Sequence, residues 1–216
     1  MARTYFYKLT NDGGGAPCVE RGLLSLAICK PRIRVGAEPG DWIFGYTANS
    51  LDPSNRLLYI AKVTDKARDG DYFRLRKYAG RRDSIYKMSD NTFAWKKGAL
   101  YHGPDDLVHD LGSPPHYPKA EVLLSSDFRY FGANGTAKYK GRYPQIKRAF
   151  EALGRGHRVH HDEPLRIELE ALRNEEWRKT GRKVLGDPTS GPSRDACYRG
   201  ASCGEVSGKK SDGKCS

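Results

Sequence analysis

Runs of apolar and aromatic residues in the first third of the chain predict short strands. Residues 4–9 read Thr-Tyr-Phe-Tyr-Lys-Leu, and this run ends at a glycine-rich turn, residues 11–15. Two further runs, residues 42–46 and 56–63, are joined by the polar loop 48–55. Two strands separated by such a loop predict an antiparallel hairpin.

The middle of the chain is less regular. Residues 23–29 form a short apolar segment that Pro31 ends, and the pattern fits a buried helical turn as well as a strand. Residues 69–78 predict a short helix with its arginines and lysine on the outside. Residues 120–125 predict one more strand.

Two amphipathic helices are predicted next. Pro144 suits the first turn of a helix that Gly154 ends. A second helix is predicted from about Asp162, a suitable N-cap, to Thr180, with a leucine stripe and charged remaining faces, so it packs along the outside. The order of elements predicts an α+β fold, which a small twisted β-barrel flanked by helices accommodates.

The pattern also predicts one domain and a tail. Residues 1–181 contain the periodic segments and form a single domain that includes the two C-terminal helices. Residues 187–216 consist largely of glycine, serine, lysine, aspartate and proline without periodicity. Such a segment buries too little apolar surface to offset the entropy of ordering, so we expect a disordered basic tail.

Charge narrows the class of partner. The formal net charge is +12, and a positive field attracts polyanions, whose counterions are released on binding. Nucleic acid is therefore the expected partner, with DNA favoured, although a protein that is merely basic would show the same charge. No stretch approaches the roughly 20 apolar residues of a membrane span, and we expect no contact with a membrane.

Cysteine and histidine positions argue against disulfides, metal and cofactors. The five cysteines contain no Cys-x-x-Cys pair, so no disulfide framework is expected. With no targeting segment, the cytoplasm is the expected location. His157, His160 and His161 lack the accompanying ligands of a structural zinc site and fit a basic loop better. We expect neither a metal site nor a cofactor.

The segment around Pro31 combines cations with a cysteine. In an extended backbone, Lys30, Arg32 and Arg34 would all lie on one side, an arrangement that suits a row of phosphates. The alternative is a solvated basic loop. Cys29 fits a small buried side chain better than a nucleophile, because no histidine or carboxylate lies near it in the sequence.

Four separated blocks carry a resemblance to a known family. They are residues 26–34, the Gly-Asp-Trp-Ile turn at 40–43, residues 83–86 and the segment 122–132. Together they resemble the nucleotide modification associated domain 2 family, within the superfamily of PUA, EVE, YTH and ASCH domains. The resemblance implies a PUA-like (EVE/ASCH-like) barrel and an association with DNA modification or its restriction. It implies no particular reaction.

Recognition of a modified base requires an aromatic slot, polar groups facing the base edge and a cationic rim for phosphates. The chain offers candidates for each. The slot candidates are Trp42, Phe44, Tyr46, Phe128, Tyr130 and Phe131; the edge candidates are Asp41, Ser125 and Asp127; and the rim candidates are Lys30, Arg32, Arg34, Arg74 and Lys77. Any one aromatic residue could equally belong to the core.

Three function classes stay open at this point. The leading hypothesis is a nucleic-acid-binding domain that recognises a modified nucleobase. The alternative is a hydrolase or glycosylase-like enzyme acting on modified nucleotides or bases, with Asp41 or Asp127 as a conceivable base and no assigned catalytic residue. The third is an interaction module without a substrate, in which the slot is filled by the protein's own side chains.

Overall fold

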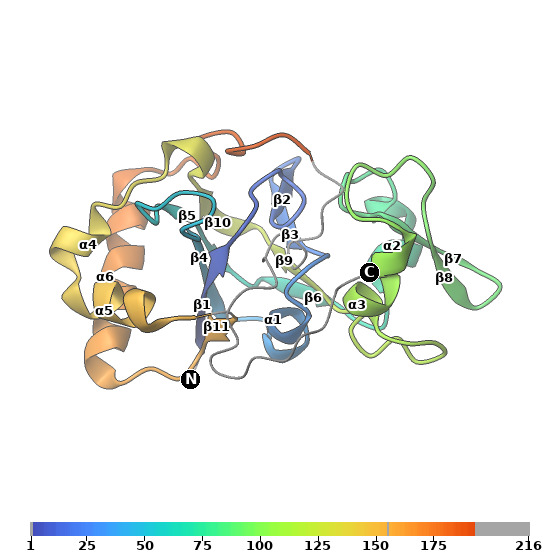
Figure 1. The fold of residues 1–216 in the computed structure, drawn as a ribbon, viewed down its shortest axis with the longest axis horizontal. Helices are drawn as coiled ribbons and strands as arrows, with labels where there is room; N and C mark the ends of the chain where they lie inside the picture. The colour runs from blue at the N-terminus through green and yellow to red at the C-terminus, as the bar shows by residue number, and fades with distance from the viewer. Residues whose placement is uncertain (1, 155, 193–216) are drawn as a thin grey trace, which may run out of the picture.

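The computed structural model describes residues 2–154 and 156–192, and a five-stranded sheet is its largest element (Figure 1). The strand order is β10-β5-β4-β1-β11. Neighbouring strands are antiparallel except β1 and β4, which run parallel with Thr4 opposite Trp42. The strands are β1 (Thr4–Leu9), β4 (Trp42–Thr47), β5 (Leu57–Lys62), β10 (Asp127–Tyr130) and β11 (His157–Arg158).

A second sheet packs against one face of the first. Its order is β2-β3-β9-β6, and all its pairs are antiparallel. Buried side chains of both sheets form a common core, in which Tyr7 and Tyr59 of the first sheet lie in one cluster with Leu123 of the second. The strands are β2 (Cys18–Glu20), β3 (Leu23–Leu26), β6 (Asp65–Ala67) and β9 (Val122–Ser125).

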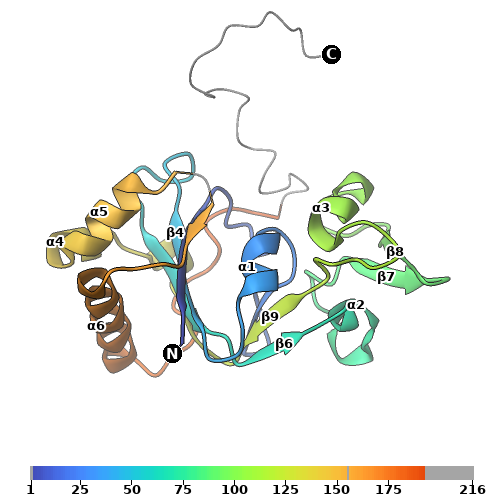
Figure 2. The same cartoon turned by 90° about the horizontal axis from the view of Figure 1, so that it is seen from below.

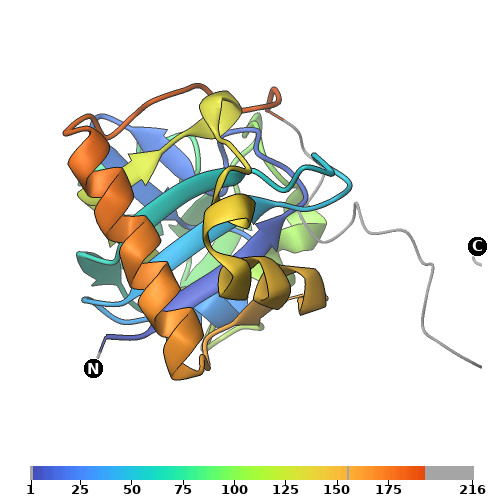
Figure 3. The same cartoon turned by 90° about the vertical axis from the view of Figure 1, so that its left-hand side faces the viewer.

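Helices cover the opposite face of the five-stranded sheet (Figure 3). Phe6, Phe44 and Ile60 of the sheet share a buried cluster with apolar residues of the helices. The carboxylate of Asp162 caps the last helix by accepting from the N–H of Leu165 at 3.1 Å. The elements are η3 (Gly132–Asn134), α4 (Tyr139–Arg142), α5 (Pro144–Ala152) and α6 (Glu163–Lys179).

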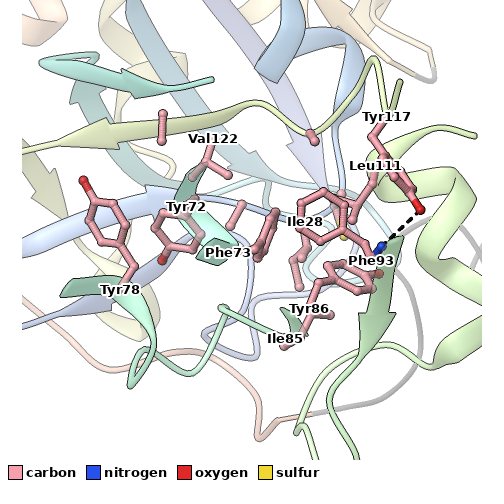
Figure 4. Close-up of a cluster of buried hydrophobic side chains, with 14 of the residues drawn as sticks. Ile28, Tyr72, Phe73, Tyr78, Ile85, Tyr86, Phe93, Leu111, Tyr117 and Val122 are labelled. Atoms are coloured by element: carbon pink, nitrogen blue, oxygen red, sulfur yellow. Dashed lines mark hydrogen bonds between the residues drawn. The ribbon is translucent and has the colours of Figure 1, made fainter. Parts of the chain in front are cut away.

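A third group of elements, which we call the outer module, lies on the far side of the second sheet (Figure 2). Because side chains alternate along β9, Leu123 faces the first sheet whereas Val122 and Leu124 face this module. Figure 4 shows its aromatic core, in which the Tyr117 hydroxyl accepts from the Phe93 N–H at 3.0 Å. The elements are α2 (Asp71–Arg74), η1 (Arg76–Tyr78), β7 (Tyr86–Ser89), β8 (Thr92–Trp95), η2 (Pro104–Asp106) and α3 (Leu107–Leu111).

The α+β class predicted from the sequence is confirmed. The strand at 4–9, the hairpin β4–β5 and the two C-terminal helices form where the pattern places them. The expected barrel does not close in the described part of the chain, where the strands divide among three sheets. The order of strands along the chain does not show which strands pair in space. For example, β1 pairs with β4 across a long stretch of sequence.

The start of the predicted tail is packed against the domain. The Thr189 N–H donates to the Asp12 carboxylate at 3.0 Å, and the Ala133 N–H donates to the Asp187 carbonyl at 2.8 Å. The rest of the predicted tail, residues 193–216, lies outside the described residues. Among the described helices, none is long and apolar enough to cross a membrane.

The outer helix α6 offers a direct test of this packing. Replacing Leu169, which is 2% exposed, by alanine leaves a cavity against the sheet, so Leu169→Ala should lower the free energy of unfolding by about 2–5 kcal/mol. Ile167 lies on the same helix but is 57% exposed, so Ile167→Ala should change it by less than about 0.5 kcal/mol. Urea denaturation measures both, and equal losses would contradict this arrangement of α6.

Candidate functional site

The turn that follows β3 has an unusual backbone. Residues 23–29, whose type the pattern leaves open, form strand β3 and then a tight turn in which Cys29 and Lys30 have φ angles of 57° and 42°. Non-glycine residues in this left-handed region each cost on the order of 1–3 kcal/mol. Such a turn persists only where surrounding contacts hold it, so its contacts identify what the fold stabilises here.

A short helix, α1 (Pro31–Gly36), begins directly after this turn. The prediction of an extended segment with three aligned cations is therefore wrong. Pro31 occupies the first helical turn, where its fixed φ is suitable and its missing N–H is not needed. The helix turns Arg34 inward, leaves Lys30 half-buried and exposes Arg32.

Arg34 is completely enclosed and holds the turn. Its Nε donates to the Cys29 carbonyl at 2.7 Å, and its terminal nitrogens donate to the carbonyls of Asp110 at 2.6 Å, Lys119 at 2.7 Å and Glu121 at 2.6 Å. With its donors directed at buried carbonyls, the guanidinium serves the fold and does not face a surface phosphate. Burial lowers the pKa of Arg34, and the nearby charge of Asp110 opposes that effect.

The turn places Cys29 beside a histidine and an aspartate from the outer module. The Cys29 sulfur lies 3.3 Å from Nε2 of His102, and Nδ1 of His102 lies 2.6 Å from the Asp110 carboxylate. The same carboxylate accepts from the Cys29 N–H at 3.0 Å and from the Tyr86 hydroxyl at 2.8 Å. Cys29, His102 and Asp110 thus form one connected chain of polar groups, which we call the thiol triad.

The carboxylate fixes the electrostatics of the triad. Burial alone would raise the pKa of Asp110, but the hydrogen bond and charge of His102, the charge of Arg34 and the Tyr86 hydroxyl outweigh burial and lower it. An ionised Asp110 holds a proton on Nδ1 of His102. Nε2, the other ring nitrogen, faces the Cys29 sulfur.

All three side chains of the triad are buried. Cys29 is 1% exposed, His102 2% and Asp110 0%. The sulfur is disulfide-bonded in this structure, although the cysteine spacing predicted no disulfide framework. The geometry therefore describes a closed, oxidised state.

Local structure sets the position of His102 as well. Its φ of 52° makes it a third left-handed non-glycine residue in the site. The Asp106 carboxylate accepts from the N–H of Gly103 at 2.8 Å and so joins this bend to the start of α3, which carries Asp110. Trp95 donates to the Tyr101 carbonyl at 3.3 Å and ties the bend to β8.

A second buried network fixes the outer module to β3. The Asp83 carboxylate accepts from Ser25 and from the Tyr72 hydroxyl, and Arg81 donates to both Tyr72 and Ser25 at 2.7 Å. Burial raises the pKa of Asp83, and the charge of Arg81 opposes this. Because Tyr86 follows Asp83 by three residues, this network also holds the tyrosine that contacts Asp110.

The structure does not gather the predicted base-pocket aromatics at one surface. Phe44 and Tyr46 are buried under the helices, whereas Phe128 and Tyr130 are buried between the two sheets. Phe131 belongs to the helical core and is 9% exposed. These residues occupy opposite faces of one sheet, because strands direct alternate side chains to opposite sides.

The predicted polar edge contacts also have partners within the fold. Asp41 pairs with Arg3 at 2.8 Å, and Ser125 donates to the Asp127 carbonyl at 2.9 Å. Asp127 accepts from Trp177 at 3.0 Å, and the Trp177 ring lies 5.3 Å from that of Trp42. Trp42 and Asp127 thus share Trp177 as a partner, at the side of α6.

The predicted cations lie in two places. Lys30 and Arg32 follow Cys29 at the start of α1, and the Lys30 ammonium lies 5.3 Å from the Tyr7 ring. Arg74 and Lys77 are exposed on the outer module, where Arg74 pairs with Asp71 at 3.2 Å. The sequence-based hypothesis of one cationic rim is therefore divided by the fold into two surfaces.

Sequence reasoning missed the triad because its members are distant along the chain. Cys29 is separated from His102 by 73 positions and from Asp110 by 81. The available signal was a cysteine placed between an apolar strand and a proline-led helix. Among the described residues, no group of three His, Cys, Asp or Glu side chains could hold a metal ion.

Comparisons with known proteins identify a family. The family model described as nucleotide modification associated domain 2 matches residues 1–188. No curated protein and no solved structure matches the chain. The two sequence blocks 26–34 and 83–86, on which the family resemblance partly rested, supply Cys29, Arg34 and Tyr86 to the site just described.

Arg34 provides a test of how the site is held. Arg34→Met removes the donors of four carbonyls, two of them in fully buried bonds, and because each unsatisfied buried group costs about 1–3 kcal/mol, the free energy of unfolding should fall by about 3 kcal/mol or more. Arg32→Met, two residues away and exposed, should change it by less than about 0.5 kcal/mol. Chemical denaturation compares the two variants, and similar values for both would show that Arg34 does not hold the turn.

Proposed function

We propose that this chain, which belongs to the nucleotide modification associated domain 2 family, is a thiol-dependent enzyme that acts on a base or nucleotide of nucleic acid. Cys29 is the nucleophile, His102 the general base and Asp110 the group that orients the imidazole. The observation that carries the proposal is the unbroken contact from the sulfur through both ring nitrogens to a buried carboxylate.

The reaction that this arrangement supports is hydrolysis at a carbonyl or amidine carbon. In the first step the thiol proton moves to Nε2 of His102, sulfur bonds to the carbon, and the leaving nitrogen or oxygen departs with that proton. In the second step a water molecule gives a proton to His102, and the water oxygen bonds to the carbon. The sulfur–carbon bond then breaks, and the thiolate takes the proton back.

Backbone strain supports a role beyond packing. Three residues at the site, Cys29, Lys30 and His102, have left-handed backbones, and none of them is glycine. Strained residues concentrate at active sites, where the surrounding structure holds them in place. The same turn brings the Cys29 sulfur to 3.3 Å from the His102 ring.

The closed state sets two conditions for activity. The disulfide at Cys29 must be reduced, because only a free thiol can lose its proton to His102. The chain around the triad must also open, because a cysteine that is 1% exposed cannot contact a substrate. Loops and lids commonly provide such access in enzymes.

Charge and family support nucleic acid as the source of the substrate. The net charge of +12 favours a polyanion over a neutral metabolite. The matched family is described by its association with nucleotide modification. A modified base that carries an acyl or amidine group would present the electrophilic carbon that a thiolate attacks.

A second candidate function is recognition of a modified base without chemistry. The exposed Arg32, together with Arg74 and Lys77 on the outer module, favours it, since cations bind phosphates whether or not a reaction follows. A relationship to PUA and EVE domains also belongs to this proposal. A reader of this kind binds modified oligonucleotides selectively and loses nothing when Cys29 is replaced.

Thiol reactivity tests the triad directly. After reduction, Cys29 should react with iodoacetamide at neutral pH, and His102→Gln should slow that reaction at least tenfold because the thiol loses its base. Cys18 is the internal control, since burial and the charge of Asp83 raise the pKa of its thiol. Peptide mapping by mass spectrometry follows each cysteine separately, and a Cys29 rate that is no higher than that of Cys18 and is independent of His102 would sink the proposal.

Activity should follow the same residues. Reduced protein incubated with DNA that carries acylated or amidine-modified bases should change the mass of a nucleoside, and Cys29→Ser should abolish that change. Loss of the general base in His102→Gln should lower the rate about 10²–10⁴-fold. His116→Gln, an exposed histidine, is the matched control. Unchanged nucleosides together with selective binding would favour the reader instead.

A further inference from the structure

A pocket beside the sheet edge is lined with basic side chains. It has a volume of about 310 Å³ and lies between α5 and β11. Its polar lining consists of His157, Arg158 and His160, and alanines, Leu153 and Val159 supply the rest. None of the described residues that line it carries a carboxylate. A concave surface with only basic polar groups suits an anion.

The strand that carries these groups is firmly attached. In β11, Arg158 pairs with Phe6 and His157 pairs with Tyr7 of β1. The His157 ring lies 5.6 Å from that of Tyr5, and His161 contacts the Thr4 carbonyl through Nε2 at 2.7 Å. His157 and Arg158 therefore sit on a sheet edge, and His160 lies in the segment that follows it.

Further cations extend from this pocket toward the thiol. Burial lowers the pKa of His157, and the positive charges of Arg32 and Lys30 lower it further. The Lys30 ammonium lies over Tyr7, the strand partner of His157. Lys30 is adjacent to Cys29 in the chain. Both Figure 1 and Figure 2 show α1 between β11 and α3, which carries Asp110.

We propose that Arg158, His157, His160 and Arg32 form a phosphate-binding track that directs a single nucleic-acid strand from the β11 pocket across α1 to Cys29. The track extends the proposed function. Only its end at Cys29 rests on that proposal, and the phosphate contacts do not. Phosphates of successive nucleotides contact the track. Arginine is suited to this role because its planar guanidinium binds phosphate through two parallel hydrogen bonds.

Several features favour a strand over a single nucleotide. The two arginines of the track belong to separate elements, Arg158 to β11 and Arg32 to α1, and so present more than one phosphate site. Arg32 and His160 are exposed and accessible to a long ligand. A chain with a net charge of +12 can displace several counterions from a nucleic-acid strand at once, and their release favours binding. A single nucleotide releases fewer.

Binding to a single-stranded DNA oligonucleotide tests the track without involving the chemistry. In a Cys29→Ala background, fluorescence anisotropy at several salt concentrations should show that Arg32→Ala/Arg158→Ala weakens binding at least tenfold at low salt. The slope of log K against log salt should become shallower by about 0.7 for each phosphate that the variant no longer neutralises. Circular dichroism confirms that each variant is folded.

Matched controls decide between surfaces. Arg178→Ala, an exposed arginine on α6, should leave the affinity unchanged, and Arg74→Ala/Lys77→Ala, two cations of the outer module, should weaken binding less than the track variant. The track is wrong if its variant binds like the parent, or if the outer-module variant carries the loss. Strand binding that needs the track while Cys29 proves unreactive would retain the track and remove the enzyme proposal.

Discussion

The structure around the candidate site depends on one buried cation. Arg34 lies in an enclosed position where an unpaired guanidinium would cost several kcal/mol, and it is stable there because carbonyls from separate segments accept its hydrogen bonds. Those segments are the turn at Cys29, helix α3 at Asp110 and the approach to β9. One interaction therefore fixes the distance between the cysteine and the elements that carry its polar partners.

The turn between β3 and α1 separates a buried cysteine, Cys29, from an exposed cation, Arg32. Its left-handed backbone directs Cys29 into the interior, where the low dielectric strengthens the contacts of His102 with Asp110. The helix that follows returns the chain to the surface and exposes Arg32. A sulfur held away from water and an exposed cation therefore lie within a few residues of each other.

The three layers of the fold have different roles in this arrangement. The helices α5 and α6 and the five-stranded sheet supply most of the packing and a rigid edge at β11. The second sheet leads into the turn. The outer module supplies His102 and Asp110, the polar neighbours of Cys29. The buried Asp83–Arg81 network ties that module to β3, so polar as well as apolar contacts hold the junction that the triad spans.

The sequence by itself determined the α+β class, the first strand, the hairpin and the two C-terminal helices, because local periodicity and capping residues such as Asp162 act over a few positions. It also indicated the family. Only the tertiary structure decided that the aromatics face two separate cores, that Arg34 is internal, and that Cys29 meets His102 and Asp110. The contacts of Cys29 join residues more than 70 positions apart. Tertiary folding brings these residues together, and no local sequence pattern encodes it.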